Sequence, residues 1–539
     1  MLRQAAWFVL AVASQAAAQT HEMHRVSVST AGAQADAPSS RPGISHDGRV
    51  VVFESEAGNL VPNDANDSPD VFVHDRLSGV TACASVGPDG LPAGGSQASI
   101  SGDGRCVVFV SDMLKVPIPG CPACTAPQVF AFDRESGDVS LVSTNPLGMP
   151  ANNECLQPFT SFEGRYVAFH SAALNLVPNS EPCDAWVVID RQDGSILRTC
   201  YDCSSSFCTL EFFLDAFSAD GSYLAHTAVE TKSAGPQIFL TAYLDNPYST
   251  GLWWGPPQVG GCSLGSYPSR LRLSFDGRWT VYRSYSVNCY PLLYLLHVDR
   301  LTGAYAVCNV NLAGEPAPVG EYDISPDGGF VAFASAAPHV VQGDSNGVPD
   351  VFVRDVAAGT TLRVSIGAHG EEPDVGGDGT AGVAAADSAT FVAFQHLAST
   401  LVPDDDNQVD DIFVFDRDPW FDLGSGLAGV QDIPRLAAVG TLEPAAPGTL
   451  LLSRAAAGAP ALFILALDSS PTPFKGGTLV AFPPAATLAL TTDAQGEIEL
   501  AFQSPPLVPA SKTFLQWAVA DKSAAQGVAL SNALKAIAP

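Results

Sequence analysis

One motif recurs seven times along this chain and limits it to a repeat architecture built from β-strands. The first copy reads Ile-Ser-His-Asp-Gly-Arg-Val-Val-Val-Phe-Glu-Ser at 44–55, followed by Asp-Val-Phe-Val-His-Asp-Arg at 70–76. The turn glycines of successive copies, replaced by Ala389 in the last, lie 51 to 61 residues apart, which leaves room for four short strands and their loops. The later copies lie at 100–111 with 128–134, 160–171 with 185–191, 217–226 with 237–240, 273–282 with 294–300, 324–333 with 350–355, and 386–394 with 411–417.

Each copy has the composition of short strands separated by tight turns. Runs of Val, Phe and Ile favour strands, and Asp-Gly marks a turn because Gly tolerates a positive φ while Asp caps the turn. A further strand follows the second half of a copy, as at 362–366, and a strand of the same kind stands alone at 24–29. No such strand follows Arg417 in the seventh copy, so we expect 24–29 to complete it. The sequence therefore predicts an all-β fold, a seven-bladed β-propeller closed by an N-terminal strand.

After Trp420 the composition changes, because Ala, Leu and Pro dominate in a part of the chain that has no Cys. Short apolar segments recur there with the spacing of a small antiparallel β-sandwich, which we expect over 422–539. Their positions are 449–453, 461–467, 486–491, 497–502 and 514–519.

The first 18 residues have the three-part form of a secretory signal peptide. Arg3 supplies a positive charge, 5–13 an apolar run, and Ala16-Ala17-Ala18 a cleavage site. No later stretch reaches the roughly 20 apolar residues of a membrane span, so we expect a secreted protein, located outside the cell, at its surface or in the periplasm. In an exported chain the twelve cysteines predict disulfides. The expected division is 1–18 signal peptide, 19–421 propeller and 422–539 sandwich.

The charge balance limits the partners of the protein. With 26 basic and 56 acidic residues, the formal net charge is −30. A groove that follows nucleic-acid phosphates, or a surface that binds anionic lipids, needs the opposite sign. We therefore expect a protein or a glycan as partner, and neither nucleic acid nor a membrane.

The repeated Ser-x-Asp-Gly-Arg-x-Val-Ala-Phe-x-Ser and Asp-Val-Phe-Val-x-Asp pattern resembles the repeat of TolB-type, WD40-like β-propellers over roughly 24–420. The resemblance implies the fold and leaves the activity open, because propellers of this type serve as binding platforms, enzyme lids and catalytic scaffolds. The family proper has six blades and an extra N-terminal domain, for which there is no room before residue 24, so its role at the cell envelope is not carried over. The last part, with Leu515–Asp521 and Ser531–Ala533, resembles C-terminal modules of secreted bacterial surface proteins.

Three copies carry an Asp-x-Asn-x-x-x-Asp loop just before their second long strand. Oxygen ligands spaced two apart on a tight loop suit Ca²⁺, and without a bidentate Glu we expect weak affinity, roughly 10⁻⁴–10⁻³ M. The other interpretation is an Asx-rich turn whose side chains bind backbone N–H groups, and the pattern favours it while leaving a calcium site open. The candidate metal ligands are Asp64, Asn66 and Asp70, Asp344, Asn346 and Asp350, and Asp405, Asn407 and Asp411.

The other chemistry-bearing residues are interpreted as structural. Carboxylates recur at the Asp-Gly turn, and Asp-Arg pairs recur after the second long strand, where we expect them to close turns and to connect blades. The two Gly-x-Ser-x-Gly matches, at 261–265 and 343–347, lack the helix that a nucleophile elbow needs. His170 and His226 are the histidines best placed to reach a channel. The turn carboxylates are Asp47, Asp103, Asp220, Asp276 and Asp327.

The function that these observations favour is a secreted, non-enzymatic binding or surface-display scaffold that uses loops on one face of the ring, with calcium as a candidate stabiliser. No catalytic residue is predicted. The alternative is an extracellular hydrolase or lyase that acts on glycans or peptides, and this would require several His, Asp or Glu side chains to converge on the channel. A third hypothesis makes the C-terminal part a module that retains the protein at the cell surface.

Overall fold

The structure of this chain is a computed structural model in which all regular elements are strands, apart from two short 3₁₀ turns, Asp387–Ala389 (η1) and Ala525–Gly527 (η2), within the described residues. In that part of the chain, no helix is long and apolar enough to cross a membrane. The all-β expectation is therefore confirmed. The signal-peptide prediction at 1–18 lies outside the described residues. These are 22–76, 78–118, 121–178, 185–199, 212–217, 223–228, 237–242, 258–259, 262–286, 293–367, 370–376, 382–416, 420–423, 425–430, 433–439, 447–503 and 511–537.

Two compact units make up the chain. We call Met23–Gly367 with Glu371–Asp416 the repeat unit, and Arg417–Pro539 the C-terminal unit. The boundary falls after Asp416, a few residues before the expected one at 421. Strands β1 to β28 are Glu22–Arg25, Ser39–Ile44, Val50–Ser55, Asp70–Asp75, Val80–Cys83, Ser96–Ile100, Cys106–Ile118, Cys121–Asp133, Val139–Leu141, Cys155–Thr160, Tyr166–Ser171, Ala185–Asp190, Ile196–Thr199, Phe212–Phe217, Tyr223–Ala228, Gln237–Ala242, Gln258–Val259, Cys262–Leu273, Trp279–Ser286, Leu293–Asp299, Tyr305–Val307, Tyr322–Ile324, Phe330–Ser335, Asp350–Asp355, Thr360–Arg363, Val383–Ala385, Phe391–His396 and Asp411–Asp416.

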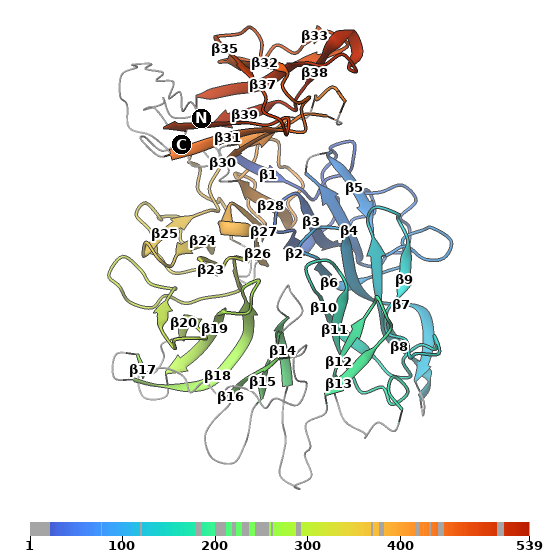
Figure 1. The fold of residues 1–539 in the computed structure, drawn as a ribbon. Coiled ribbons are helices and arrows are strands. Elements are labelled where there is room, and N and C mark those ends of the chain that lie inside the picture. The colour runs from blue at the N-terminus through green and yellow to red at the C-terminus, as the bar shows by residue number, and fades with distance from the viewer. Residues whose placement is uncertain are drawn as a thin grey trace. The chain divides into compact units, whose positions relative to one another are not determined.

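The strands of the repeat unit form one antiparallel sheet for each sequence repeat. In chain order the described strands give the sheets β2–β5, β6–β9, β10–β13, β14–β16, β17–β21 and β22–β25, which we number first to sixth. The seventh sheet has the order β1-β28-β27-β26, so its outermost strand comes from the start of the chain. Figure 1 shows the innermost strands β2, β6, β10 and β26 around the middle of the unit, and β5, β9 and β13 at its periphery.

We call the middle of the repeat unit its axis. The Asp-Gly turns that join the first two long strands of a sheet, such as β2 and β3, lie at what we call the turn end. The loops that follow strands such as β3 lie at the opposite end, the loop end. The innermost strands of successive sheets contact one another, β2 with β6, β6 with β10, and β26 with β2.

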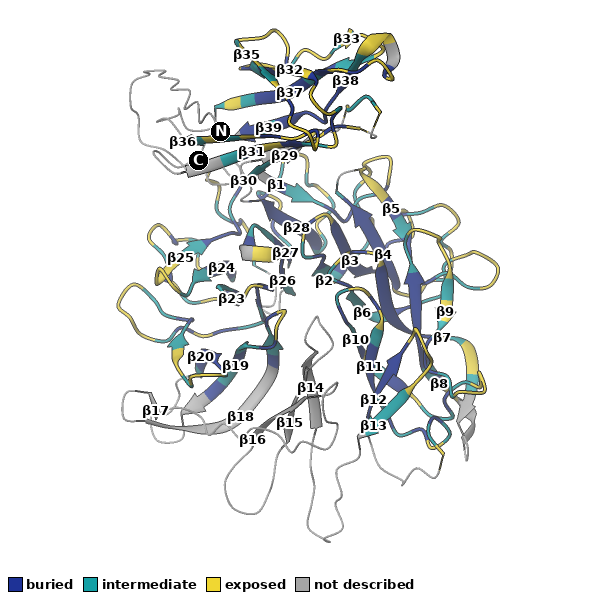
Figure 2. Cartoon of the chain, viewed as in Figure 1, coloured by how far each residue is buried: buried dark blue, intermediate teal, exposed yellow. Residues whose placement is uncertain are grey.

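The central strands of the first sheet are covered by neighbouring sheets on both faces. All six residues of β3 and of β4 are buried, as Figure 2 shows in dark blue. This burial explains why the motif is a continuous apolar run. A strand with one solvent-exposed face would instead alternate apolar and polar residues. Apolar cores fill the spaces between sheets, and one of them combines Phe53 and Phe72 of the first sheet with Ala393 and Ile412 of the seventh.

Gly48 shows why the turn needs glycine. Its φ is +70°, in the left-handed region that side chains other than glycine rarely adopt. A Cβ at this position would also lie 1.9 Å from a ring carbon of Phe391 in the seventh sheet. The Asp-Gly motif is thus a turn and, at the same time, a point of close approach between sheets.

The C-terminal unit contains two larger sheets over a shared core and a separate two-stranded sheet made by β33 and β34. One of the larger two has the order β29-β39-β37-β32-β35, with β38 also on β37, and the other has the order β30-β31-β36. Leu436 and Leu452 of the smaller sheet pack with Phe463 and Trp517 of the larger one. Its strands β29 to β39 are Trp420–Asp422, Arg435–Val439, Pro447–Ser453, Pro460–Ala466, Thr472–Phe474, Gly477–Leu479, Ala486–Thr491, Ile498–Gln503, Lys512–Ala520, Val528–Leu530 and Leu534–Ile537.

Candidate functional site

The carboxylates of the Asp-Gly turns cap their own turns. Asp47 Oδ1 accepts hydrogen bonds from the Ser45 hydroxyl at 2.6 Å and from the Arg49 N–H at 3.0 Å. The same pair of bonds recurs at Asp103, Asp276 and Asp327. The structural interpretation of these four residues is confirmed, whereas Asp220 lies outside the described residues.

The Asp-Arg pairs connect neighbouring sheets. Asp75 Oδ2 lies 2.7 Å from a guanidinium nitrogen of Arg49 in its own sheet and 2.9 Å from one of Arg134 in the second sheet. Arg76 of the first sheet pairs with Asp416 of the seventh at 2.8 Å. The expected connection between repeats is therefore confirmed at these positions, and Arg417 lies outside the described residues.

The three predicted calcium loops lie at the loop end of the first, sixth and seventh sheets, so their residues form three separate groups. In the first loop Asn66 Nδ2 donates to Asp70 Oδ2 at 2.7 Å, and Asn66 Oδ1 accepts from the Ser68 N–H at 2.8 Å. Asp70 Oδ1 also accepts from the Gly94 N–H at 3.0 Å. Burial, and then the charge of Asp70, raise the pKa of Asp64. The bond from the Ser68 N–H to Asn66 Oδ1 is that of an Asx turn.

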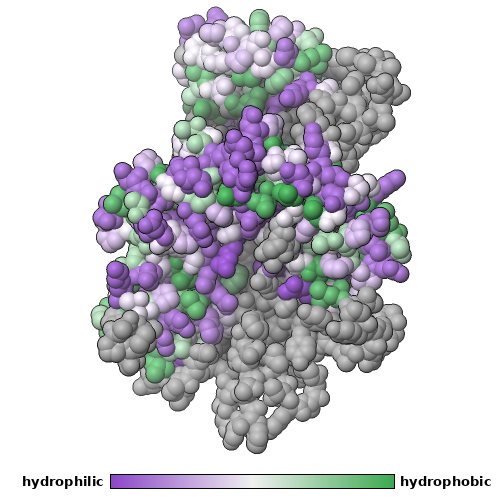
Figure 3. All heavy atoms as spheres, turned by 180° about the vertical axis from the view of Figure 1, so that it is seen from behind, coloured by the Kyte–Doolittle hydropathy of each residue, from purple (hydrophilic) through white to green (hydrophobic). Residues whose placement is uncertain are grey.

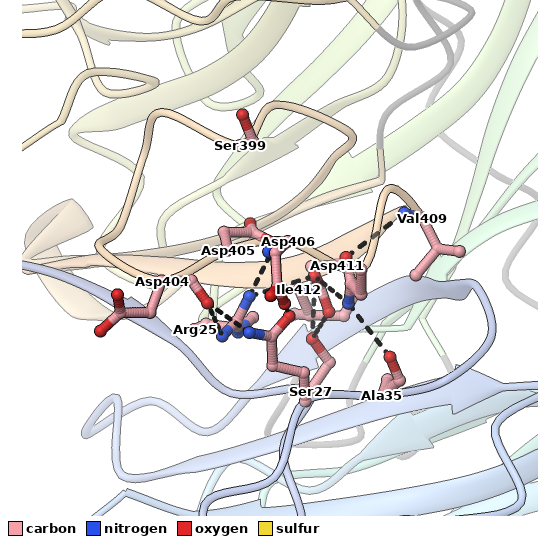
Figure 4. Close-up of polar contacts among 12 residues, drawn as sticks. Arg25, Ser27, Ala35, Ser399, Asp404, Asp405, Asp406, Val409, Asp411 and Ile412 are labelled. Carbon is pink, nitrogen blue, oxygen red and sulfur yellow. Dashed lines mark hydrogen bonds and ion pairs between the residues drawn. The ribbon is translucent and has the colours of Figure 1, made fainter.

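The loop in the seventh sheet contains an arginine from the start of the chain (Figure 4). Arg25 on β1 lies 2.8 Å from Asp405 Oδ1 and 3.6 Å from Asp411 Oδ2. Asn407 Nδ2 donates to Asp411 Oδ2 at 2.8 Å, repeating the bond of the first loop. Burial raises the pKa of Asp405 to about 6, although Arg25 acts in the opposite direction. The guanidinium thus supplies a positive charge beside both carboxylates.

The loop in the sixth sheet has the same arrangement. Arg363 on β25 approaches Asp344 Oδ1 at 3.8 Å and Asp350 Oδ2 at 3.6 Å, and it binds Glu372 Oε1 at 2.6 Å. Burial raises the pKa of Asp350 to about 6 against the effect of Ser365 and Arg363. Asn346 lies in the same loop and donates to the Pro373 carbonyl at 3.3 Å.

The arginines at these loops were missed at the sequence level. A shared signal exists, since Arg-Val-Ser occurs at 25–27 and again at 363–365. In the first sheet Cys83 takes the place of this arginine. Cys83 pairs with Phe72 as Arg363 pairs with Phe352, and each phenylalanine is the second residue after the last aspartate of its loop. Within the part of the chain that is described, no group of three or more His, Cys, Asp or Glu side chains is arranged to hold a metal ion. Calcium binding by these loops stays a prediction.

Three aromatic rings meet on the axis at the turn end. His46, Phe162 and Phe275 come from the first, third and fifth sheets, and each occupies the variable position of the turn motif, which is Ser-x-Asp-Gly in the first and fifth sheets and Ser-x-Glu-Gly in the third. Their ring centroids are 5.0 to 5.6 Å apart in edge-to-face contacts. Because the three sheets are not neighbours, these side chains can meet only near the middle of the unit. The rings therefore fill the axis at this end.

Backbone hydrogen bonds connect the turns that carry these rings. The His46 N–H donates to the Gly102 carbonyl at 2.9 Å, and the His46 carbonyl accepts from the Asp387 N–H at 3.0 Å. A bond of the same kind runs from the Phe275 N–H to the Pro326 carbonyl at 2.7 Å. The turn end is thus held together around the axis.

Further along the axis, three consecutive innermost strands bulge at an equivalent position. Arg41, Gln97 and Gln157 have φ values of 52°, 53° and 53°, and the register with the next strand shifts at each of them. Left-handed backbone at residues other than glycine costs roughly 1–2 kcal/mol each. Strain of this kind, repeated in three sheets, is typical of functional positions.

Side chains connect the three bulges in one direction around the axis. Glu54 Oε1 accepts from the Gln97 N–H at 2.6 Å, and Gln97 Oε1 accepts from the Gln157 N–H at 2.7 Å. Arg41 lies 3.5 Å from Glu54 Oε2. The Arg41 and Gln157 side chains at the two ends of this series are exposed. We call Arg41, Glu54, Gln97 and Gln157 the polar arc; no sequence pattern indicated it.

The remaining candidates do not assemble a reactive centre in the described residues. His170 packs against Trp186 in a tilted arrangement, with the ring centroids 5.1 Å apart. The hydroxyl of Ser345, in the second Gly-x-Ser-x-Gly match, donates to Glu372 at 2.7 Å, and a strand follows its loop. Residue 261 and the side chains of the rest of the first match, like the side chain of His226, lie outside what the structure describes.

The expected disulfides do not form among the cysteines whose side chains are described. Cys83, Cys106, Cys155 and Cys308 are buried and free. Burial raises the pKa of Cys155 to about 12, as expected for a thiol that packs as a small apolar group. For these four residues the prediction was wrong, since each faces the core between two sheets. The other eight lie outside the residues with described side chains.

No family model and no curated protein matches this chain. Among solved structures it is similar to an oligogalacturonate lyase in complex with manganese, with 13% identity, a TM-score of 0.47, and coverage of 74% of this chain and 94% of that chain. It is also similar to the β-propeller domain of the trilobed protease from Pyrococcus furiosus, with 12% identity, a TM-score of 0.42, and 70% and 93% coverage. TolB from Acinetobacter baumannii follows with 13% identity, a TM-score of 0.35, and 61% and 63% coverage. With identities of 12–13% and TM-scores below 0.5, these similarities say nothing about activity. The description of the fold is based on the sheet order given above.

Proposed function

We propose that this protein is an exported seven-bladed β-propeller, closed by β1 and followed by a C-terminal β-sandwich, that works as a non-enzymatic binding scaffold. The pairing of β1 with β28 supports the closure, as do the core shared by the first and seventh sheets and the ion pair between Arg76 and Asp416. The core shared by the two C-terminal sheets supports the sandwich. The signal-peptide pattern at 1–18 supports export.

The polar arc is the observation that carries the binding role. It presents a guanidinium at Arg41 and a side-chain amide at Gln157 from strands, which hold side chains more rigidly than loops do. Amides and guanidinium groups bind hydroxyl groups and backbone carbonyls, so a glycan or an extended peptide fits this surface. With His46, Phe162 and Phe275 filling the turn end, such a ligand would enter from the loop end.

The test is a binding screen of the full chain against an array of glycans and extended peptides. Ligands that bind should lose roughly tenfold or more in affinity when Gln157→Ala or Arg41→Ala removes one end of the arc. Gln192→Ala is the matched control, because Gln192 is an exposed residue in the turn between β12 and β13. Equal binding by all variants would overturn the assignment to the arc.

The same screen separates the scaffold from its enzymatic alternative. A scaffold releases its ligand intact, whereas a hydrolase or lyase returns shortened products. Mass spectrometry of the recovered ligand after prolonged incubation distinguishes the two. Cleavage that disappears in Gln157→Ala would replace the proposed function with a glycan- or peptide-degrading one.

A further inference from the structure

We infer that the loop of the first sheet, at 64–70, binds one Ca²⁺ ion from solution, whereas the equivalent loops of the sixth and seventh sheets hold an arginine of this chain in the same place. The carboxylates of Asp64 and Asp70 are the charged ligands of the ion. The inference reduces the three predicted calcium loops to one. It goes beyond the proposed function, which depends on the polar arc.

Two loops of this chain already hold a positive charge between the residues in question. In the seventh sheet, Arg25 Nη1 lies 2.8 Å from Asp405 Oδ1 and 3.6 Å from Asp411 Oδ2, as Figure 4 shows. In the sixth sheet, Arg363 Nη1 lies 3.8 Å from Oδ1 of the first loop aspartate and 3.6 Å from Oδ2 of the last. The same pair of oxygens thus binds a cationic nitrogen in two of the three copies, and this evidence for a cation site does not depend on the first loop itself.

The first loop has no arginine at the equivalent position. In each of the three sheets, an N–H donates at 2.7 to 2.8 Å to the carbonyl of the residue that follows the last loop aspartate. The residue before this N–H is Arg25 in the seventh sheet, Arg363 in the sixth and Cys83 in the first. The Cys83 thiol lies 3.8 Å from Asp70 Oδ1 and brings no positive charge. The carboxylates of the first loop are therefore the pair that a soluble cation can occupy.

The charge in the first loop is negative. After burial, the charges that raise the pKa of Asp64 are those of Asp70 and Asp36. Within the described residues, no basic side chain pairs with Asp64 or Asp70. The donors that reach the fully buried Asp70 carboxylate are neutral; they are Asn66, Cys83, Ser85 and Gly94. A cation between the two carboxylates would offset their repulsion, as the arginines do in the other two loops.

The geometry favours Ca²⁺ among the divalent cations. The arginine nitrogens lie 2.8 to 3.8 Å from the loop oxygens. Ca²⁺ binds oxygen at about 2.3–2.6 Å and Mg²⁺ at about 2.0–2.1 Å, so Ca²⁺ requires the smaller contraction of the loop. Ca²⁺ also accepts irregular coordination that backbone carbonyls and water complete. With two carboxylates and no bidentate Glu, we expect a Kd of roughly 10⁻⁴–10⁻³ M.

Equilibrium dialysis of the full chain against radioactive calcium tests the inference. Figure 3 shows hydrophilic residues over much of the described surface on one face, and the chain has 56 acidic residues, so about 0.1 M KCl is present to screen weak association elsewhere. We expect one Ca²⁺ per chain, with affinity reduced roughly tenfold or more by Asp64→Asn. Cys83→Arg supplies the guanidinium that the other two loops contain and should abolish binding. Cys83→Ser brings no charge and should retain it.

Asp67→Asn is the matched charge control, because Asp67 is an exposed residue of the same loop and is neither of the two ligands. It removes the same charge and should leave the affinity unchanged. Thermal unfolding in chelator shows which variants are folded, and Asp64→Asn against Asp67→Asn decides the outcome if Cys83→Arg does not fold.

Three results would overturn the inference: no saturable binding, equal losses in Asp64→Asn and Asp67→Asn, or full binding by a folded Cys83→Arg variant. Two or three ions per chain would overturn it as well, since the arginines would then not exclude calcium from their loops. Gln157→Ala should not alter calcium binding, so this site and the polar arc are tested separately.

Discussion

Replacing Arg76 with alanine should weaken the contact between the first and seventh sheets. Arg76 lies 2.8 Å from Asp416 Oδ2, donates to the Gly48 carbonyl at 2.7 Å, and stacks over the Phe391 ring at 4.5 Å. The two side chains of the ion pair are 13% and 1% exposed, so solvent screens the pair little. Arg76→Ala removes all three interactions at once.

The expected cost follows from this burial. Breaking a buried ion pair by removing one partner costs about 3–5 kcal/mol, and a hydrogen bond to a charged group contributes about 1.5–3 kcal/mol. We expect a loss near the lower limit, about 3 kcal/mol. Arg49→Ala is the matched control, since Arg49 is 42% exposed and its partner Asp75 keeps Arg134, so its cost should stay below about 1 kcal/mol.

Hydrogen exchange is the suitable assay, because a chain of two units does not unfold in one step and local opening is the quantity of interest. The amides of β1 and β28 should exchange on the order of 100-fold faster in Arg76→Ala than in the unmodified chain. Those of the C-terminal unit should not change. Equal exchange in the Arg76 and Arg49 variants would refute the reasoning, because burial would then not determine the strength of these pairs.

Three further predictions concern the turns and the loops. Gly48→Ala should lower the free energy of unfolding by about 3 kcal/mol, because its φ is positive and its Cβ would clash with the seventh sheet. Gly79→Ala should cost about 1 kcal/mol, since its φ is also positive but its Cβ would meet no atom. Thermal unfolding of the two variants measures both losses. Because the pKa of Asp350 is raised to about 6, the stability that it contributes is present below about pH 4 and lost as the pH rises through 6. Asp350→Asn should flatten this decline in a pH series of unfolding temperatures, and identical profiles would contradict the assignment. If the loops bind calcium as predicted, calcium should raise the unfolding temperature above its value in chelator and Asp64→Asn should reduce that rise, whereas equal temperatures would leave the loops as Asx turns.

Sequence reasoning found the features that depend on local chemistry. The Asp-Gly turns were identified correctly because their hydrogen bonds run between residues two apart, as at Asp47. The strands were identified because burial on both faces leaves a continuous apolar run, as in 50–55. The link between Asp75 and Arg134 was expected from the recurrence of Asp-Arg pairs in successive copies.

What sequence reasoning missed depends on contacts between distant segments. The partners of Arg25 lie about 380 positions away, so no local pattern indicates them. The bulges at Gln97 and Gln157 depend on the register of the adjacent strand, which composition does not encode. The free thiol of Cys155 shows that a rule based on the export compartment does not determine the role of one residue that packs in a core.

The sheet that combines β1 with β28 places a constraint on the order of folding. The Ser27 hydroxyl accepts a hydrogen bond at 3.0 Å from the Ile412 N–H, which lies 385 positions later in the chain. Joining the ends of so long a segment adds little to the equilibrium cost, since closure entropy grows only with the logarithm of length, but it slows folding. During synthesis the first strand must therefore wait until β28 has been made. The repeat unit then becomes complete in one late step, when the earliest and latest strands pair.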